Sequence, residues 1–391
     1  MMFSRSPRFA MGLMAAASVV ALHTSPALAF DPSGNEIADA FLAMLDAEEG
    51  TVESYGAVNT SGSEVTITDL VVKDEGSDEA TVTIAKTVLS DGELQSNGRL
   101  KLSALGLENL NLDADDGGMS LQSLNVTDLV LPSVEEITSE TTTMNPGYRT
   151  FEVNAVEIRD ENGKVADIAN ISSSIDGMDG DLPTSGQFSI TGAVIDAKQI
   201  ADDGGKELIE LGYETLSLDL SSSGKWDPDA ATLVVPELKI DAQDAASLSL
   251  SFSLGGVTRE VVNQLEANSE NPEKAMEYLQ QVTISNIKIR LDDASLTGRI
   301  LDQEASKAGV ETPVYVAGLT GSLPLMLGML QNKELEGQVA QAVTEYLTTP
   351  GSLEVVASPG APVPVSQIVG TAMLAPQMIP QILSVAITAN Q

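Results

Sequence analysis

The sequence contains no cysteine and a single histidine, His23. Without these side chains a protein cannot build a Ser-His-Asp or Cys-His nucleophile system, a thiolate redox centre, or an ordinary zinc, copper, haem or iron–sulfur site. Disulfides are excluded as well, so a packed core must provide the stability. We therefore expect a protein without cofactors, and we expect it not to be an enzyme.

Aromatic residues are also scarce, at 4% of the chain, and Trp226 is the only tryptophan. Glycan sites usually use aromatic platforms, so we interpret Trp226 as a packing residue beside a turn. No glycine-rich phosphate loop stands between a strand and a helix, which leaves nucleotide chemistry without a motif.

Basic residues are also scarce. The chain has 20 Lys and Arg residues against 57 Asp and Glu residues, a formal net charge of -37. Such a surface repels nucleic acid phosphates, so we expect no nucleic acid partner. Solubility explains the acidity, and a surface made for cations or a basic partner is the alternative.

Two kinds of chemistry remain open to an acidic chain. A carboxylate hydrolase would need paired acids, and the adjacent pairs are Asp115 with Asp116 and Glu135 with Glu136. Calcium takes oxygen ligands only, but the acidic runs at residues 113–118 and 176–181 lack the spacing of known calcium loops. We interpret both runs as turns and predict no metal site, and calcium binding there stays an open alternative.

The N-terminus has the pattern of a secretory signal peptide. Arg5 and Arg8 precede an uncharged apolar run at residues 9–22, and small residues lead up to a cleavage site after Ala29. The run is shorter than the roughly 20 residues of a spanning helix, and Phe30 rather than cysteine follows the cut. We predict a signal peptide at residues 1–29, a periplasmic location with secretion as the alternative, and no transmembrane helix in the mature chain.

The mature chain changes its apolar period twice. Helical spacing at residues 30–50 gives way to alternation over residues 51–256, and helical spacing returns over residues 257–391. We predict an N-terminal helix, an antiparallel sheet region and a helix-rich α+β region. The expected strands are residues 65–72, 100–112, 121–131, 151–158, 188–195, 215–221, 233–240, 247–254 and 284–291.

Two of these strands have the cleanest apolar face. Their inward positions are Leu216, Leu218 and Leu220 in one strand and Leu248, Leu250 and Phe252 in the other. A sheet with one apolar face must bury it against helices, a second sheet, a partner or a ligand. These six residues are our candidates for a hydrophobic ligand site, and an ordinary core is the alternative.

The C-terminal region has unusual stretches without charge. Residues 313–332 contain none, and because glycines and prolines interrupt them we predict two buried helical pieces. Residues 355–391 also contain no Asp, Glu, Lys or Arg. We expect this tail to form a strand, a helix and a final strand within the core, with a surface for lipid or a membrane partner as the alternative. The other expected helices are residues 257–267, 272–281, 294–308 and 334–347.

Three stretches carry a resemblance to other proteins: YETLSLDLSSSGKWDP at 213–228, NIKIRLDDASLTGRILDQEASKAG at 286–309 and PGSLEVVASPGAPVP at 350–364. In these the chain resembles a group of uncharacterised alphaproteobacterial periplasmic proteins rich in β-strands, and more loosely it is similar to the AsmA-like envelope families. The resemblance implies an extended sheet and an unknown or lipid-linked role. It transfers no functional residue, because the shared patterns are strand patterns.

The sequence thus favours an α+β fold, in which an extended or curved antiparallel sheet is followed by helices that cover its apolar face. The leading functional hypothesis is an acidic envelope protein that binds a lipid or another hydrophobic ligand on that face. A structural or protein-interaction module is the second hypothesis, with an envelope protein as partner, and a carboxylate hydrolase is the third.

Overall fold

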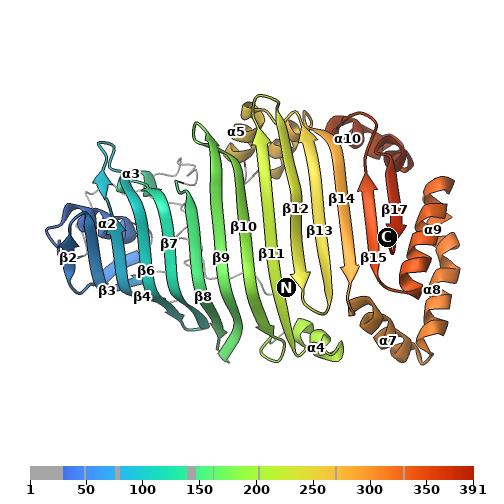
Figure 1. Ribbon diagram of the computed structural model, residues 1–391, viewed down its shortest axis with the longest axis horizontal. Helices are drawn as coiled ribbons and strands as arrows, with labels where there is room; N and C mark the ends of the chain where they lie inside the picture. The colour runs from blue at the N-terminus through green and yellow to red at the C-terminus, as the bar shows by residue number, and fades with distance from the viewer. Residues whose placement is uncertain are drawn as a thin grey trace. The chain divides into compact units, whose positions relative to one another are not determined.

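The computed structural model describes residues 30–47, 50–74, 80–138, 147–161, 163–200, 203–268, 271–328 and 331–391. The predicted signal peptide at residues 1–29 lies outside the described residues. The chain divides into two compact units, and the boundary between Ile175 and Asp176 falls inside β9 (Gly163–Asp179). Both units consist of antiparallel strands with several helices (Figure 1), which confirms the expectation of an α+β fold with extensive antiparallel sheet.

The first unit is an open antiparallel sheet whose strand β3 pairs with β1, β2 and β4, followed by β6, β7, β8 and β9. The short β5 pairs with β6. Its helices are α2 (Glu36–Ala47) and α3 (Val134–Ile137), and its other strands are β1 (Gly50–Ser54), β2 (Val58–Ser61), β3 (Glu64–Asp74), β4 (Thr81–Ser90), β5 (Glu93–Leu94), β6 (Leu100–Ala114), β7 (Gly117–Leu131) and β8 (Thr150–Asp160).

Helix α2 packs on the apolar face of this first sheet, against β1, β3, β5 and β6. It begins where the Asn35 side chain accepts hydrogen bonds from the backbone N–H groups of Ile37 and Ala38, as an N-cap residue does. Its apolar side places Phe41 and Leu42 in the core of the unit, against leucines of β6 and valines of the neighbouring strands. The predicted N-terminal helix within residues 30–50 is therefore confirmed.

A line of unusual backbone conformations crosses the first sheet. Asp69 in β3, Asn109 in β6 and Ala155 in β8 all have φ near +50°, in the left-handed region. In each pairing the register steps over these residues, so that they stand level with one another across the sheet. We call this line the crease: one residue on each strand is left out of the pairing, and the strands continue in the same register on both sides of it.

The second unit contains the antiparallel order β10, β11, β12, β13, β14, β15 and β17, with the short β16 beside β14. Its strands are β10 (Leu182–Asp196), β11 (Thr215–Asp227), β12 (Thr232–Ala242), β13 (Ala246–Gly255), β14 (Thr283–Asp293), β15 (Ser352–Ala357), β16 (Val363–Pro364) and β17 (Val385–Ala389). Its helices are α4 (Asp203–Glu210), α5 (Arg259–Ala267), α6 (Pro272–Leu279), α7 (Leu296–Ala308), α8 (Thr312–Leu327), α9 (Lys333–Thr348), α10 (Val365–Leu374), the 3₁₀ turn η2 (Pro376–Met378) and α11 (Ile379–Ile382).

All nine strands expected from alternation are present in this order. The expected change from strands to helices near residue 256 falls inside the second unit, between β13 and α5.

The prediction for residues 313–332 was wrong. Instead of two buried pieces, one continuous helix, α8, runs through Pro324, and Val316 is its only buried residue. The hydroxyl groups of Thr320 and Ser322 donate to the backbone carbonyls of Val316 and Leu319, one turn earlier, at 2.9 and 2.7 Å.

The expectation of a buried C-terminal tail is correct only for its strands. β15 and β17 form the sheet edge, where Ala357 and Ala389 are buried, but α10 has no buried residue. The tail thus combines sheet strands with a helix that lies on the surface.

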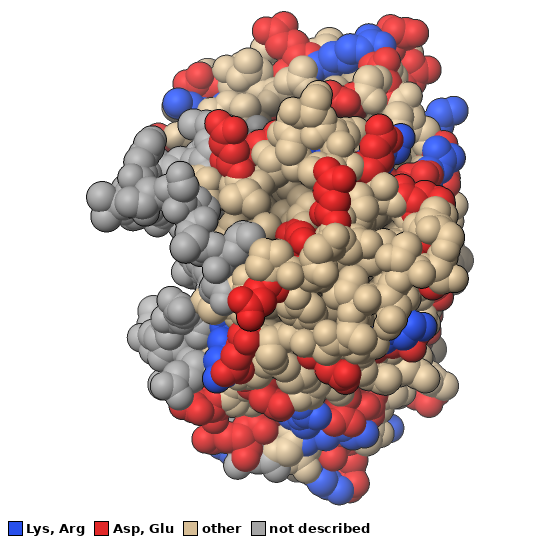
Figure 2. Space-filling view, turned by 90° about the vertical axis from the view of Figure 1, so that its left-hand side faces the viewer, with Lys and Arg blue, Asp and Glu red and all other residues tan. Residues whose placement is uncertain are grey.

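Charged side chains stay on the surface of the part of the chain that the structure describes, where the buried polar residues are Thr87, Ser133 and Ser352. The space-filling view shows acidic side chains spread over one side of the molecule, with basic side chains among them (Figure 2). The high negative charge is therefore a surface property and does not enter either core.

Candidate ligand-binding face

The six candidate side chains lie on one face of the second sheet. Leu216, Leu218 and Leu220 alternate along β11, and Leu248, Leu250 and Phe252 alternate along β13. Strand β12 separates the two rows, but the register carries the face across it, since Leu220 is opposite Ile240 and Ile240 is opposite Leu248. Directly opposed residues of antiparallel strands point to the same side.

The same face continues beyond β13 to the last strand of the sheet. One row of opposed residues consists of Leu220, Ile240, Leu248, Leu291, Leu353 and Ala389. The next row along β12, β13, β14 and β15 consists of Leu238, Leu250, Ile289 and Val355. Every side chain of both rows is a hydrocarbon, and the polar side chain beside them on this face is Ser222 of β11, opposite Leu238.

Helices cover the two ends of the face. At one end Trp226 packs with Val257 and Val261 of the α5 segment, and the indole nitrogen Nε1 of Trp226 donates to the carbonyl of Val257 at 2.7 Å. This confirms the packing role expected for Trp226. At the other end Tyr346 of α9 packs with Leu353 and Ile387.

Between these covered ends the face is partly open to solvent. Ile240 is 39% exposed, Leu248 43% and Ile289 44%, although their strands are in the middle of the sheet order. Phe188 of β10, opposite Ser222 of the same face, is 40% exposed. We call these four residues, Phe188, Ile240, Leu248 and Ile289, the open apolar face.

Sequence reasoning named only Leu248 of the open apolar face. The signal for the other three was present, because Phe188, Ile240 and Ile289 are apolar positions of strands that alternation had already identified. The six candidates were chosen for the regularity of their strands, and regularity says nothing about exposure.

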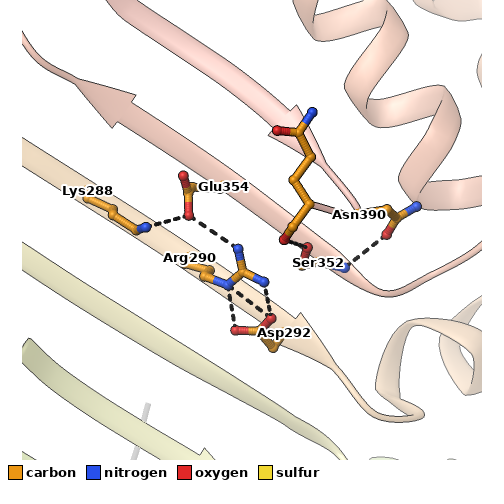
Figure 3. A network of polar contacts seen from close by, with 7 residues as sticks. Lys288, Arg290, Asp292, Ser352, Glu354 and Asn390 are labelled. Carbon is orange, nitrogen blue, oxygen red and sulfur yellow. Dashed lines mark hydrogen bonds and ion pairs between the residues drawn. The ribbon is translucent and has the colours of Figure 1, made fainter.

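The opposite face of the sheet is polar and tied by ion pairs. The Glu354 carboxylate accepts from Nζ of Lys288 at 2.7 Å and from a guanidinium nitrogen of Arg290 at 3.3 Å (Figure 3). Arg290 also binds Asp292 at 2.7 Å. The Lys288 ammonium and then Arg290 lower the pKa of Glu354 below its usual value. Alternation thus separates a hydrocarbon face from a charged one on the same strands.

The two adjacent acid pairs, which are more typical of solvated turns than of a hydrolase site, lie in a turn and on the short helix α3. Asp115 and Asp116 are exposed in the turn between β6 and β7. Glu136 binds the Arg99 guanidinium at 2.6 Å and closes a capping box with Ser133 at the start of α3. Its hydrogen bonds from Arg99, helped by the Ser133 backbone, lower its pKa to about 2, so Glu136 is ionised at neutral pH and unsuited to donate a proton.

The described residues offer no group of three acidic side chains placed to hold a metal ion. A shallow polar hollow beside α4 and α7 contains Arg299 and Lys307, but both cations are engaged. Arg299 stacks 4.4 Å from the centre of the Tyr213 ring, and Lys307 pairs with Glu304 at 2.8 Å. The hollow therefore presents no free charge for an anionic ligand.

No described helix combines the length and the apolar character needed to cross a bilayer.

Comparison with known proteins gives limited information. A search of curated proteins finds none that matches the chain. The model of a family described as "Uncharacterized protein" matches residues 239–390, from within β12 through β17. Over that stretch, which includes most of the open apolar face and all of α5 to α11, the chain is similar to this family.

Proposed function

We propose that this protein is exported to the periplasm and binds a lipid or another ligand with a hydrocarbon chain on the open apolar face of its second unit. One observation carries the proposal: the middle of a continuous hydrocarbon face is exposed in Phe188, Ile240, Leu248 and Ile289. It is a proposal for a binding protein rather than an enzyme, and it agrees with the signal-like N-terminus and the loose resemblance to envelope families.

The physical argument rests on the hydrophobic effect. Each Å² of apolar surface removed from water contributes roughly 25 cal/mol of favourable free energy. The four large side chains of the open apolar face are about two-fifths exposed, so a ligand that covered them would gain this free energy on binding. The apolar row of β13 runs from Leu248 to Phe252, about 13 Å at the rise of a strand, before Leu254 packs on the Trp226 cluster, and this length accommodates part of an extended acyl chain.

The chemistry of the face also restricts the ligand. The two central rows are hydrocarbon only, and an ion placed on them would lose its hydration without gaining a partner. The part of the ligand on this face is therefore uncharged, and a polar headgroup would extend beyond the rows to the ends of the strands.

A second function is that of an interaction module whose apolar face is covered by protein. The expectation that helices cover the face belongs to this alternative, and the covers at the two ends, around Trp226 and Tyr346, favour it. In that case an envelope protein would complete the cover where our proposal places a lipid.

Native mass spectrometry with lipid extraction tests the proposal. The full chain is expressed in bacteria, purified from the periplasmic fraction and compared with two variants of β12. Ile240→Asp changes the open apolar face, and Val234→Asp changes a side chain of equal exposure, 39%, on the opposite face. We expect a stoichiometric lipid adduct that Ile240→Asp abolishes and Val234→Asp retains. We also expect the protein mass to equal that of a chain cleaved after Ala29, with Phe30 as its first residue.

A wild-type protein that carries no lipid and takes up none from offered lipids would overturn the binding proposal. A co-purifying protein that is lost in Ile240→Asp and kept in Val234→Asp would establish the interaction module instead. A chain that keeps residues 1–29, or that stays in the cytoplasm, would contradict the proposed export.

A further inference from the structure

The most exposed large hydrophobic side chains of the described residues do not belong to the open apolar face. They are Leu374 at 89%, Leu325 at 85%, Met373 at 81% and Met326 at 63%, two at the end of α8 and two at the end of α10. We call them the apolar tips. Side chains of this size and exposure have an unfavourable contact with water that a partner would remove.

Helix α8 has few contacts for a helix of its composition. Its sequence, TPVYVAGLTGSLPLML, is apolar around the whole circumference, and helices of this kind are normally buried in a protein core or in lipid. Yet only Val316 is buried, while Val314 is 60% exposed on the same helix. Its neighbours α7 and α9 therefore leave an apolar side without a protein partner.

The two tips lie in the only long uncharged stretches of the part of the chain that the structure describes. Residues 313–332 and 355–391 contain no charged side chain in a protein of net charge -37, and charge returns at Lys333 and Glu334. An acidic surface is repelled by anionic headgroups. Within these two stretches no carboxylate adjoins the projecting side chains in sequence, and the acidic residues that follow the α8 tip are Glu334 and Glu336 in the first turn of α9.

The fold brings both tips toward one region of the second unit. α10 follows β16, which pairs with the first residues of β14, and η2 and α11 lead from α10 into β17. α9 packs on β17 and contacts α8. In Figure 1 α10 lies at the upper end of β15 and β17, and α8 and α9 stand beside β17.

We propose that the apolar tips dock this protein on the surface of a phospholipid bilayer, with Leu325, Met326, Met373 and Leu374 inserted among the lipids. At 16 residues α8 is about 24 Å long, shorter than the hydrocarbon layer of about 30 Å. The helix is therefore too short to span the layer, and only its exposed end enters the lipid.

A bilayer fits the tips better than a second copy of the chain. Fluid lipid accepts projecting side chains without a preformed hollow, whereas a protein surface needs a complementary apolar one. On a second copy the hollow beside α4 and α7 is lined by polar residues such as Glu210 and Arg299, and the apolar surface on offer is the open apolar face, which the self-association measurement below tests. This inference does not depend on the ligand proposed above, because none of the tip residues belongs to the open apolar face.

Vesicle flotation tests the docking. The full mature chain is mixed with phosphatidylcholine vesicles and compared with the double variant Leu325→Asp/Leu374→Asp. The control is Met276→Asp, which changes a 48% exposed methionine of α6 between the charged residues Glu273 and Glu277. We expect the double variant to lower vesicle binding by at least about tenfold and the control to leave it within about twofold, since burial of two leucines is worth more than 1.4 kcal/mol.

Three further measurements make the outcome decisive. Phosphatidylglycerol in the vesicles should weaken binding, and added salt should restore it, because the protein is acidic. The variant Ile240→Asp should still dock, which separates docking from ligand binding. Equal flotation of the wild type and the double variant would overturn the inference. So would self-association without vesicles, in analytical ultracentrifugation, that the double variant abolishes, since it would identify a second copy as the partner.

Discussion

The two units start from the same strand pattern and end with different apolar faces. In the first unit Leu89, Leu100 and Leu102 are fully buried, whereas Leu248 and Ile289 of the second unit are more than two-fifths exposed. The strands do not explain this difference, because apolar and polar residues alternate equally well in both. A helix, α2, lies over the first face, while the helices of the second unit reach only the ends of theirs. Alternation decides which side chains share a face, and the connections between strands decide whether that face is closed.

The largest effect should come from opening the closed face of the first unit. Leu102→Ala removes a fully buried side chain and leaves a cavity, which should cost about 3 kcal/mol of unfolding free energy. Hydrogen exchange of peptides from β6 and β7 in increasing urea measures the change. A loss below about 1 kcal/mol would mean that the first face is less tightly packed than its burial indicates.

A smaller loss is expected where the second unit is covered. Trp226→Phe keeps an aromatic ring but leaves the carbonyl of Val257 without its donor, at a cost of about 2 kcal/mol. Hydrogen exchange of peptides from β11 and α5 follows the effect. An unchanged exchange rate would show that water replaces the indole donor and that this end is as accessible as the middle.

The third prediction concerns the pH dependence of the first unit. The pKa of Glu136 is about 2 in the folded chain and 4.5 ordinarily, so its ionised form stabilises the fold fully above pH 4.5. That contribution is lost as the pH falls toward 2. Because the Arg99 partner is 42% exposed, Glu136→Gln should cost only about 1 kcal/mol at pH 7 and nothing near pH 2.

Glu135→Gln on the same helix is the control for Glu136→Gln, since Glu135 is exposed and takes no part in the capping box. Urea unfolding at both pH values gives the comparison. If Glu136→Gln cost the same free energy at pH 2 as at pH 7, the charge of Glu136 would not be its source.

The smallest loss should come from the open apolar face itself. Leu248→Ala removes a side chain that is already 43% exposed, so it should cost less than about 1 kcal/mol. The measurement is exchange of β13 peptides in urea, beside Leu102→Ala. Equal costs for the two leucines would contradict the difference between the units.

Much of the fold could be predicted from the sequence, because polar and apolar residues alternate with a period of two in strands that have one solvent-exposed face and one apolar face. The strand that carries Leu216, Leu218 and Leu220 and the one that carries Leu248, Leu250 and Phe252 were both identified in this way. The exposure of Leu248 could not be, since it depends on where helices distant in sequence come to lie. The error at α8 has a local cause: Pro324 and the glycines indicated a break, whereas the helix continues through the proline to Leu327.

The crease across the first sheet predicts which substitutions its residues tolerate. Asp69, Asn109 and Ala155 are all exposed, and surface positions usually accept almost any residue. Their left-handed backbone, however, suits glycine, asparagine and aspartate and disfavours β-branched side chains. A complete set of single substitutions should therefore show valine and isoleucine rejected and glycine accepted at these three exposed positions. Selection at these sites would follow the backbone geometry of the chain rather than the burial of a side chain.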